Sequence, residues 1–216
     1  QGYSSAASDV YKRQEYIIMN DDYNNDYDFE DEFDFDEEEI DLPEDVIYLD
    51  EGADAYNKKD YEKAISLYEK SASLGNVTAL SNLGYCYYYG RSIPVDKEKA
   101  KSYWEEAAIF GDIPAVYKLG DMYRNGDLPK RIEYSHKLYR RAFEMALNDL
   151  DNYYVAPDAM LRMMKYYPDE LEEYGDKLAI ALKCIQGIKK RIAEGDPYSQ
   201  KVLKDAKECL LKIIDE

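Results

Sequence analysis

A 36-residue internal repeat is the feature that most constrains the fold. SNLGYCYYYG (81–90) is followed by YKLGDMYRNG (117–126), so that a leucine, a glycine, a tyrosine and a second glycine recur 36 residues apart. Upstream, Ala64, Tyr68, Ala72 and Gly75 recur at the same spacing as Ala100, Trp104, Ala108 and Gly111. A fixed period in the range of roughly 20–50 residues is typical of a solenoid of stacked supersecondary units.

Each copy of the repeat predicts a hairpin of two helices. We expect the first helix at about 77–89 and the second at about 97–110. Gly90 stands where a helix ends in a left-handed residue, and Asp96 is placed to cap the second helix. A glycine that ends one helix and an Asn or Asp that caps the next also occur together at Gly75-Asn76, at Gly111-Asp112 and at Gly195-Asp196-Pro197. The third of these predicts a last helix at about 197–214.

Small residues at fixed positions predict close packing of the two helices. A glycine inside a helix costs about 1 kcal/mol relative to alanine, so Gly84 needs a packing reason. Gly120 occupies the equivalent position 36 residues later. We expect the backbones to approach at these glycines and the large rings of Tyr68 and Trp104 to fill the space between neighbouring units.

These residues carry a family resemblance. LGYCYYYG and EKAKSYWEEAAIFGD, within 83–112, resemble the Sel-1-like repeat of the tetratricopeptide-like superfamily. The resemblance covers about 45–147; it is strong for the second unit, good for the third and partial for the first. It implies an all-α fold: a right-handed α–α superhelix, or solenoid of helical hairpins, that acts as a protein-protein interaction scaffold. In such solenoids the first helix of each unit lines a concave, peptide-binding face.

Composition divides the chain into four segments. Residues 1–14 lack the pattern of a signal peptide and are expected to be a non-native scar. Residues 15–43 form an acidic, aromatic arm that we expect to be disordered. Residues 44–149 hold the repeats. Residues 150–216 keep helical spacing of apolar residues without the period, which predicts either a diverged repeat or a C-terminal helical cap.

The net charge of −18 is concentrated in the arm. From Glu15 to Asp45 there are 16 acidic residues and no Lys or Arg, whereas residues 46–216 carry only −3. Nucleic acid and anionic membranes need a clustered positive field, so we expect neither as a partner. No apolar run is long enough to span a bilayer. Acidic and aromatic residues alternate in the arm, which suits either a docking segment or a solubilising tail.

The sequence lacks the residues of a catalytic or metal centre. His136 is the single histidine, and no phosphate loop, dinucleotide-binding turn or nucleophile elbow occurs. The aspartates of 21–32 lack the glycine and glutamate of a calcium loop. The three cysteines form no CxxC pair, which indicates reduced core thiols and favours the cytoplasm. We therefore expect a protein that is not an enzyme and that has no cofactor and no metal.

Two surfaces are candidates for binding. The resemblance places a groove on the first helices of units two and three, and its residues would be Ser81, Tyr85, Tyr88, Tyr89, Tyr117, Asp121, Arg124 and Asn125. The basic segment KRIEYSHKLYRR (130–141) is a candidate docking site for an acidic segment, through Lys130, Arg131, Lys137, Arg140 and Arg141. That acidic segment is either the chain's own residues 15–43 or part of a protein or peptide partner.

Two functions follow from these surfaces. The first is a scaffold or adapter that binds a peptide or protein on the concave face. The alternative is an inhibitor or immunity-type protein whose acidic arm mimics nucleic acid or blocks a basic site.

Overall fold

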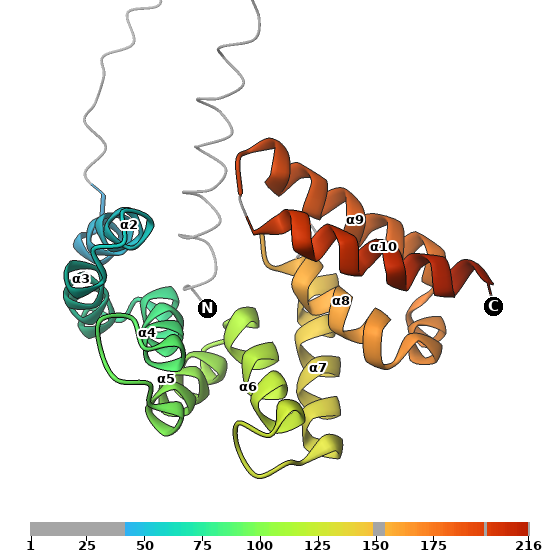
Figure 1. Cartoon of the computed structure of the whole chain (residues 1–216), viewed down its shortest axis with the longest axis horizontal. Coiled ribbons are helices and arrows are strands. Elements are labelled where there is room, and N and C mark those ends of the chain that lie inside the picture. The colour runs from blue at the N-terminus through green and yellow to red at the C-terminus, as the bar shows by residue number, and fades with distance from the viewer. Residues whose placement is uncertain (1–41, 149–153, 197, 216) are drawn as a thin grey trace, which may run out of the picture. The chain divides into compact units, whose positions relative to one another are not determined.

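The computed structural model describes residues 42–148, 154–196 and 198–215, so the predictions made for 1–14 and for nearly all of the arm 15–43 lie outside the described residues. Within that part every regular element is helical, and the fold is an all-α, right-handed superhelix of helical hairpins (Figure 1). The elements are α2 (Glu44–Asn57), α3 (Tyr61–Ser73), α4 (Val77–Tyr89), α5 (Lys97–Ile109), α6 (Ile113–Asn125), α7 (Ile132–Leu147), α8 (Ala156–Tyr166), the 3₁₀ helix η1 (Pro168–Tyr174), α9 (Lys177–Ala193) and α10 (Ser199–Asp215).

The helix boundaries follow the caps that the sequence predicts. Gly90 ends α4 in the left-handed conformation, with φ of 67°, which glycine adopts without strain. The side chains of Asn76, Asp96 and Asp112 accept hydrogen bonds from the backbone N–H three residues later. The predicted first helix at 77–89 is confirmed, and the second ends one residue earlier than expected.

Each hairpin is closed by a glycine that contacts an aromatic ring. A Cβ atom added to Gly84 would lie 2.6 Å from Trp104 Cδ1, and one added to Gly120 would lie 2.6 Å from Tyr139 Cε1. Gly52 and Tyr68 form the equivalent pair in the first hairpin, at 2.7 Å from the ring's Cε1. The rings therefore lie against the glycine of their own hairpin, rather than only between units as the sequence suggested.

Hydrophobic packing runs along the repeats in two clusters. One cluster joins α2, α3 and α4 around Tyr68 and Leu83. The other runs from α4 to α10 and includes the fully buried Trp104, Tyr139 and Phe143. The three cysteines, Cys86, Cys184 and Cys209, are free and buried, as the sequence predicts.

Residues after the third hairpin continue the helical stack. α8 packs on α7 and also on α6, α9 packs on α8, and α10 packs on both α8 and α9. The helices α4, α6 and α8 are thus neighbours, because α6 contacts each of the other two. The surface on these three first helices, called here the α4–α6–α8 face, is the place to look for a binding site.

Candidate functional site

The structure distributes the predicted groove residues between core and surface. Ser81 and Tyr117 are buried, with exposed fractions of 1% and 6%. Tyr85, Tyr88, Asp121 and Arg124 are partly buried, whereas Asn125 and Tyr89 are exposed. Tyr89 has an exposed fraction of 48%, which makes it the most accessible ring of α4. A ligand on this face would therefore meet Tyr89 before the other tyrosines of the helix.

Ser81 belongs to the framework of the hairpin. Its hydroxyl donates to Asp112 Oδ1 over 2.9 Å, and its backbone carbonyl accepts from Trp104 Nε1 over 3.0 Å. Asp112 also accepts from the backbone N–H of Ala115, and it thereby caps α6. Burial raises the pKa of Asp112 to about 6, against the opposing effect of these two hydrogen bonds. The hydroxyl of Ser81 therefore stabilises the junction between the second and third units through its hydrogen bond to Asp112.

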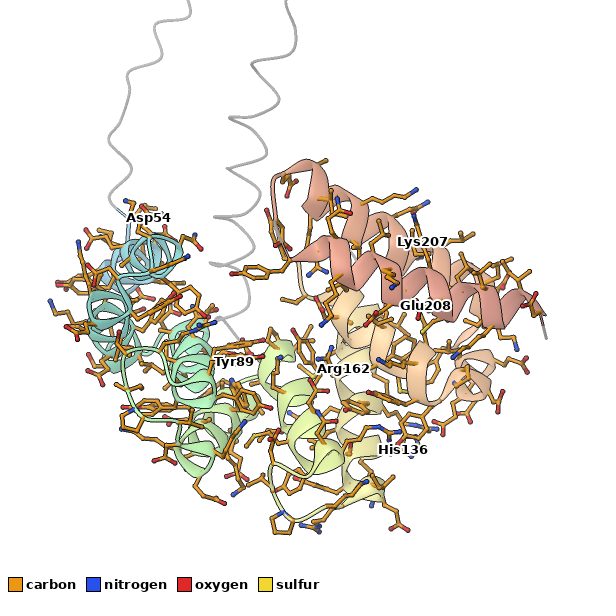
Figure 2. All side chains as sticks on the ribbon, viewed as in Figure 1. Asp54, Tyr89, His136, Arg162, Lys207 and Glu208 are labelled. Carbon is orange, nitrogen blue, oxygen red and sulfur yellow. The ribbon has the colours of Figure 1, made fainter. Side chains whose placement is uncertain are left out.

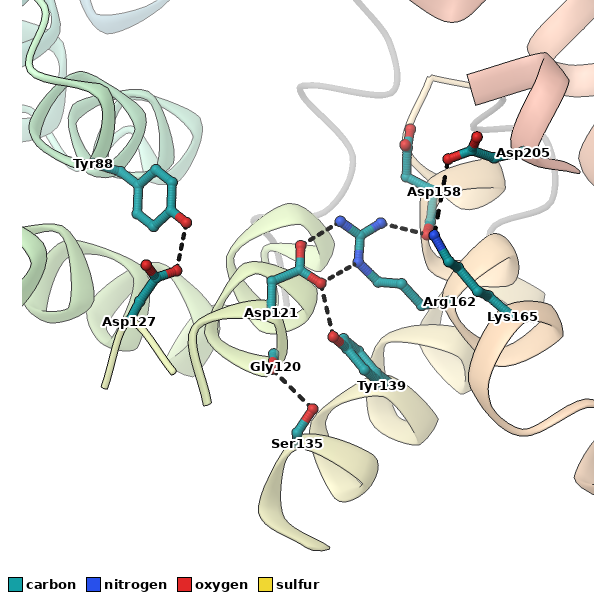
Figure 3. Close-up of polar contacts among 10 residues, drawn as sticks. All are labelled: Tyr88, Gly120, Asp121, Asp127, Ser135, Tyr139, Asp158, Arg162, Lys165 and Asp205. Carbon is teal, nitrogen blue, oxygen red and sulfur yellow. Dashed lines mark hydrogen bonds and ion pairs between the residues drawn. The ribbon is translucent and has the colours of Figure 1, made fainter. Parts of the chain in front are cut away.

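An arginine that the sequence did not single out ties α8 to α6 at the centre of the face. Arg162 donates from Nε to Asp121 Oδ1 over 2.9 Å and from Nη2 to Asp121 Oδ2 over 2.5 Å (Figure 3). Asp121 also accepts from the Tyr139 hydroxyl over 2.8 Å. A bidentate pair of this kind fixes orientation as well as charge. Asp121, predicted as a groove residue, is therefore already engaged within the protein.

The Arg162 guanidinium also contacts Tyr117 of α6 and Asp158 of α8. It lies 3.9 Å from the centre of the Tyr117 ring, and Nη1 donates to the carbonyl oxygen of Asp158 over 2.7 Å. Burial on its own would lower the pKa of Arg162, but the charge and hydrogen bonds of Asp121 raise it instead. Arg162 consequently keeps its charge at every physiological pH.

Lys118 and Tyr85 lie near the Arg162 guanidinium. Lys118 Nζ lies 5.0 Å from the centre of the Tyr85 ring, a cation–π contact between α6 and α4. Burial, assisted by the positive charge of Arg162, lowers the pKa of Lys118. Burial beside Tyr117 raises the pKa of Tyr85, so its hydroxyl stays protonated and can donate a hydrogen bond.

Tyr88 is hydrogen-bonded to a different carboxylate, Asp127. Its hydroxyl donates to Asp127 Oδ2 over 2.5 Å, and Lys97 Nζ lies 3.2 Å from the ring centre (Figure 3). Lys97 pairs with the same carboxylate, Asp127, at 3.3 Å. Burial raises the pKa of Tyr88, and the hydrogen bond to Asp127 acts in the same direction. Tyr88 therefore joins α4 to the loop that follows α6.

Tyr89 lies next to several charged groups. Tyr89 of α4 and Arg162 of α8 both lie beside α6 (Figure 2). Burial and the charge of Asp121 raise the pKa of Tyr89, whereas Arg91 and Arg162 act to lower it. Its ring is stacked with Tyr85, with the ring centres 6.4 Å apart. The exposed Tyr89 ring therefore lies near one negative charge, on Asp121, and two positive charges, on Arg91 and Arg162.

Arg124 is held by aromatic residues of the segment after the third hairpin. Its guanidinium lies 3.7 Å from the centre of the Tyr166 ring, and Nη1 donates to the Tyr167 hydroxyl over 3.2 Å. Asn125, the next residue, is exposed at the end of α6. The eight predicted groove residues thus lie on neighbouring helices, but they do not form one continuous exposed surface.

The basic segment 130–141 is partly neutralised by η1. Arg140 pairs with Glu170 at 2.6 Å and with Glu173 at 3.4 Å, and His136 bonds to the same Glu170 at 2.8 Å. Burial acts to raise the pKa of Glu170, but the hydrogen bonds from Arg140 and His136 outweigh it and lower the pKa. Four cations of the segment remain exposed: Lys130, Arg131, Lys137 and Arg141. Of these, Arg141 donates to the carbonyl oxygen of Ala108 over 2.9 Å.

The described residues contain no group of three or more His, Cys, Asp or Glu side chains arranged to hold a metal ion. Among the helices that the structure describes, none is both long and apolar enough to cross a membrane.

Comparison with known proteins identifies the repeats. The Sel1 repeat family model matches residues 49–76, 77–109 and 113–147. These matches coincide with the three hairpins α2–α3, α4–α5 and α6–α7. A search of curated proteins finds no match.

Several solved structures are similar to this chain. A Sel1 repeat protein from Oxalobacter formigenes is 24% identical, and the match covers 73% of this chain and 74% of the other, with a TM-score of 0.47. The c5321 protective antigen of uropathogenic Escherichia coli is 20% identical, covering 75% of this chain and 48% of the other, with a TM-score of 0.42. The immunity protein Pa5087 of Pseudomonas aeruginosa is 18% identical, covering 80% and 83%, with a TM-score of 0.38.

Proposed function

Because this chain is a Sel1 repeat protein with three repeats between residues 49 and 147, we propose that it is an interaction scaffold whose binding surface is the α4–α6–α8 face. Sel1 repeat proteins generally mediate protein–protein interactions, and their fold is typically non-catalytic. The partner is a protein or a peptide. Mechanism here means that groups are held at fixed positions on rigid helices, without bond chemistry.

The main support for this proposal is the exposed ring of Tyr89, which lies beside charged side chains that ring contacts and hydrogen bonds hold in place. A tyrosine ring brings a large contact area at a low cost in side-chain entropy, and tyrosine is enriched at binding hot spots. Lys118 and the Arg162–Asp121 pair beside it are fixed by ring contacts and by the bidentate hydrogen bonds. A surface that is ordered before binding loses less conformational entropy when a partner docks.

Affinity capture with crosslinking tests the scaffold proposal. The full chain carrying Tyr89→Ala and Lys118→Ala should lose partners that the wild type retains. Lys101→Ala is the matched control, because Lys101 pairs with Glu105 on its own helix α5, and an exposed pair of this kind contributes about 0–1 kcal/mol. A folded double variant that captures the same partners as the wild type would exclude this face.

A second proposal concerns residues 15–43. The arm carries most of the chain's negative charge, and Lys130, Arg131, Lys137 and Arg141 offer exposed positive charge on and before α7. We propose that the arm docks on this segment in cis until a partner displaces it. A peptide of residues 15–43 should then bind the chain from residue 44 to residue 216 at low salt and more weakly at high salt. Absence of binding at both salt concentrations would exclude intramolecular docking.

The alternative is an inhibitor or immunity-type protein, and the density of charge between Glu15 and Asp45 is the observation that favours it. Such an arm would mimic nucleic acid or block a basic site on a partner. The two functions differ in which segment holds the partner. Capture by the peptide 15–43 alone supports the inhibitor, whereas capture that needs Tyr89 and Lys118 supports the scaffold.

A further inference from the structure

Arg91 is enclosed by three tyrosine rings. Its guanidinium carbon lies 5.8 Å from the ring centre of Tyr56, 5.1 Å from that of Tyr61 and 5.5 Å from that of Tyr89. Arg91 Nε donates to the Tyr56 hydroxyl over 3.1 Å. These four residues, called here the Arg91 cage, bring together α2, α3 and the end of α4. Aromatic faces that hold a guanidinium leave its N–H fork oriented for a further partner.

The Arg91 cage contains no carboxylate. In the parts of the chain that the structure describes, no Asp or Glu forms an ion pair with Arg91, and the hydrogen bond to Tyr56 raises its pKa, although burial opposes it. Two arginines that are more deeply buried differ in this respect. Arg162 pairs with Asp121, and Arg191 pairs with Asp158 at 2.5 Å. Arg91 is thus a half-buried cation whose Nε bonds to Tyr56, which leaves the two Nη nitrogens for a partner.

A small aromatic hollow adjoins the Arg91 cage. It has a volume of about 150 Å³, is open to solvent, and is lined by Tyr56, Tyr68, Asn82 and Tyr85. Tyr56 belongs to both the hollow and the cage. Typical small-molecule sites occupy about 300–1,000 Å³, so this hollow is sized for a single side chain rather than for a metabolite or cofactor. The Asn82 amide adds one polar group that can bond to a peptide backbone.

We propose that the Arg91 cage and this hollow bind a short motif of a partner protein in which one carboxylate lies next to one aromatic side chain. The ring enters the hollow, and the carboxylate accepts hydrogen bonds from the Arg91 fork. This inference rests on the proposed scaffold function and names the chemistry of its partner.

The charge around the cage selects a partner segment with a single carboxylate. α4 carries no charged residue, so Arg91 is the positive charge at its carboxyl end, where the helix dipole also favours a cation. The neighbouring α2 carries five acidic residues: Glu44, Asp45, Asp50, Glu51 and Asp54. These repel a densely acidic segment such as residues 15–43, but they leave room for one carboxylate on the Arg91 fork.

The test uses the full chain and the probe peptide acetyl-Ser-Gly-Phe-Asp-Gly-Ser-amide, with dissociation constants from NMR titration. We expect binding by the wild type. Replacing the aspartate of the probe by asparagine, or its phenylalanine by alanine, should weaken binding about 10-fold or more. Arg91→Ala should weaken binding of the intact probe to the same extent, and Arg91→Lys should fall between the two because it keeps the charge but loses the fork.

Lys99→Ala is the matched control. Lys99 Nζ lies 4.0 Å from the centre of the Tyr87 ring and donates to the Tyr87 hydroxyl over 2.6 Å, so this substitution removes one ring-contacting charge outside the proposed binding surfaces. Its affinity for the probe should equal that of the wild type. An unchanged melting temperature of Arg91→Ala shows that the loss of binding is not a loss of fold.

Three outcomes would overturn the proposal. One is no binding of the probe, and another is equal binding by wild type and Arg91→Ala. The third is binding only after the acidic residues of 30–39 are changed to amides, since the site would then be occupied by the chain's own arm. Tyr89 belongs both to the cage and to the α4–α6–α8 face, so Arg91→Ala is also tested in partner capture. Partners retained by Arg91→Ala but lost by the Tyr89→Ala and Lys118→Ala variant would show failure of the motif without failure of the scaffold function.

Discussion

Substitution of Gly84 by alanine tests the packing rule of the repeat. In a solvent-exposed helix this change stabilises by about 1 kcal/mol, because alanine has the higher helix propensity. Here the new Cβ would lie 2.6 Å from Trp104 Cδ1 and 2.8 Å from Cε2. Trp104 cannot move aside freely, since it is fully buried and its Nε1 donates to the Ser81 carbonyl. We therefore expect Gly84→Ala to destabilise the protein.

The magnitude follows from opposing contributions. Overpacking of a core costs about 1–3 kcal/mol, and loss of the Trp104–Ser81 hydrogen bond costs about 1 kcal/mol. Subtracting the gain in helix propensity leaves a decrease of about 1–3 kcal/mol in the free energy of unfolding. For a chain of this size, each kcal/mol lowers Tm by about 2–4 °C.

Urea unfolding followed by far-UV circular dichroism measures this change. Trp104 is the single tryptophan, so its fluorescence reports directly on the ring that must move. Thr78→Ala, at an exposed position of the same helix, is the control and should stay within about 0.5 kcal/mol of the wild type. A Gly84→Ala protein as stable as the wild type, with unchanged Trp104 emission, would refute the packing argument.

Three further predictions concern charge and reactivity. The folded-state pKa of Asp112, about 6, exceeds the ordinary aspartate pKa of 3.8, so this group should lower the free energy of unfolding as pH rises from about 4 to 6, by at most about 3 kcal/mol. Asp112→Asn should therefore gain stability relative to the wild type over that range in pH-dependent urea titrations; a constant difference would contradict it. Arg162→Ala should lower the free energy of unfolding by about 2–4 kcal/mol, and a double-mutant cycle with Asp121→Asn should give a coupling energy of about 1–3 kcal/mol. Additive effects of the two substitutions would show that the pair does not stabilise the packing of α8 on α6. The three buried cysteines should react with a thiol reagent only after unfolding, because burial raises their pKa, to about 11 for Cys86; rapid native reaction would contradict their burial.

The repeated part of the fold could be predicted because its signals are local. A glycine that ends one helix and an Asn or Asp that caps the next act over a few residues, so they are visible in the sequence. The prediction of α4 at 77–89 agrees with the structure for this reason. The glycine and the aromatic ring of each hairpin also follow in the same order, 16 residues apart in Gly52 and Tyr68, 20 in Gly84 and Trp104, and 19 in Gly120 and Tyr139, because the links between the helices differ in length.

The contacts of the candidate site could not be predicted in the same way. Position on a first helix placed Ser81 and Tyr117 on the groove side, but neighbouring helices cover both. Arg162 lies 41 residues from its partner Asp121, in the segment where the period is lost, so no spacing rule linked them. Glu170 lies in η1, which has no counterpart in the repeat, so no repeat position indicated that it would pair with Arg140.

Comparison of the units with one another separates framework from surface. Leu83 and Leu119, which occupy the same position in successive units, have exposed fractions of 1% and 4%. The positions of Tyr85, Tyr88 and Tyr89 are occupied in the next unit by Asp121, Arg124 and Asn125. Repeated positions are fixed by packing that every hairpin must satisfy, whereas these three positions differ because each meets different neighbours on the α4–α6–α8 face. Under the proposed scaffold function, the exposed members of this varying set, Tyr89 and Asn125, are the ones expected to contact a partner directly.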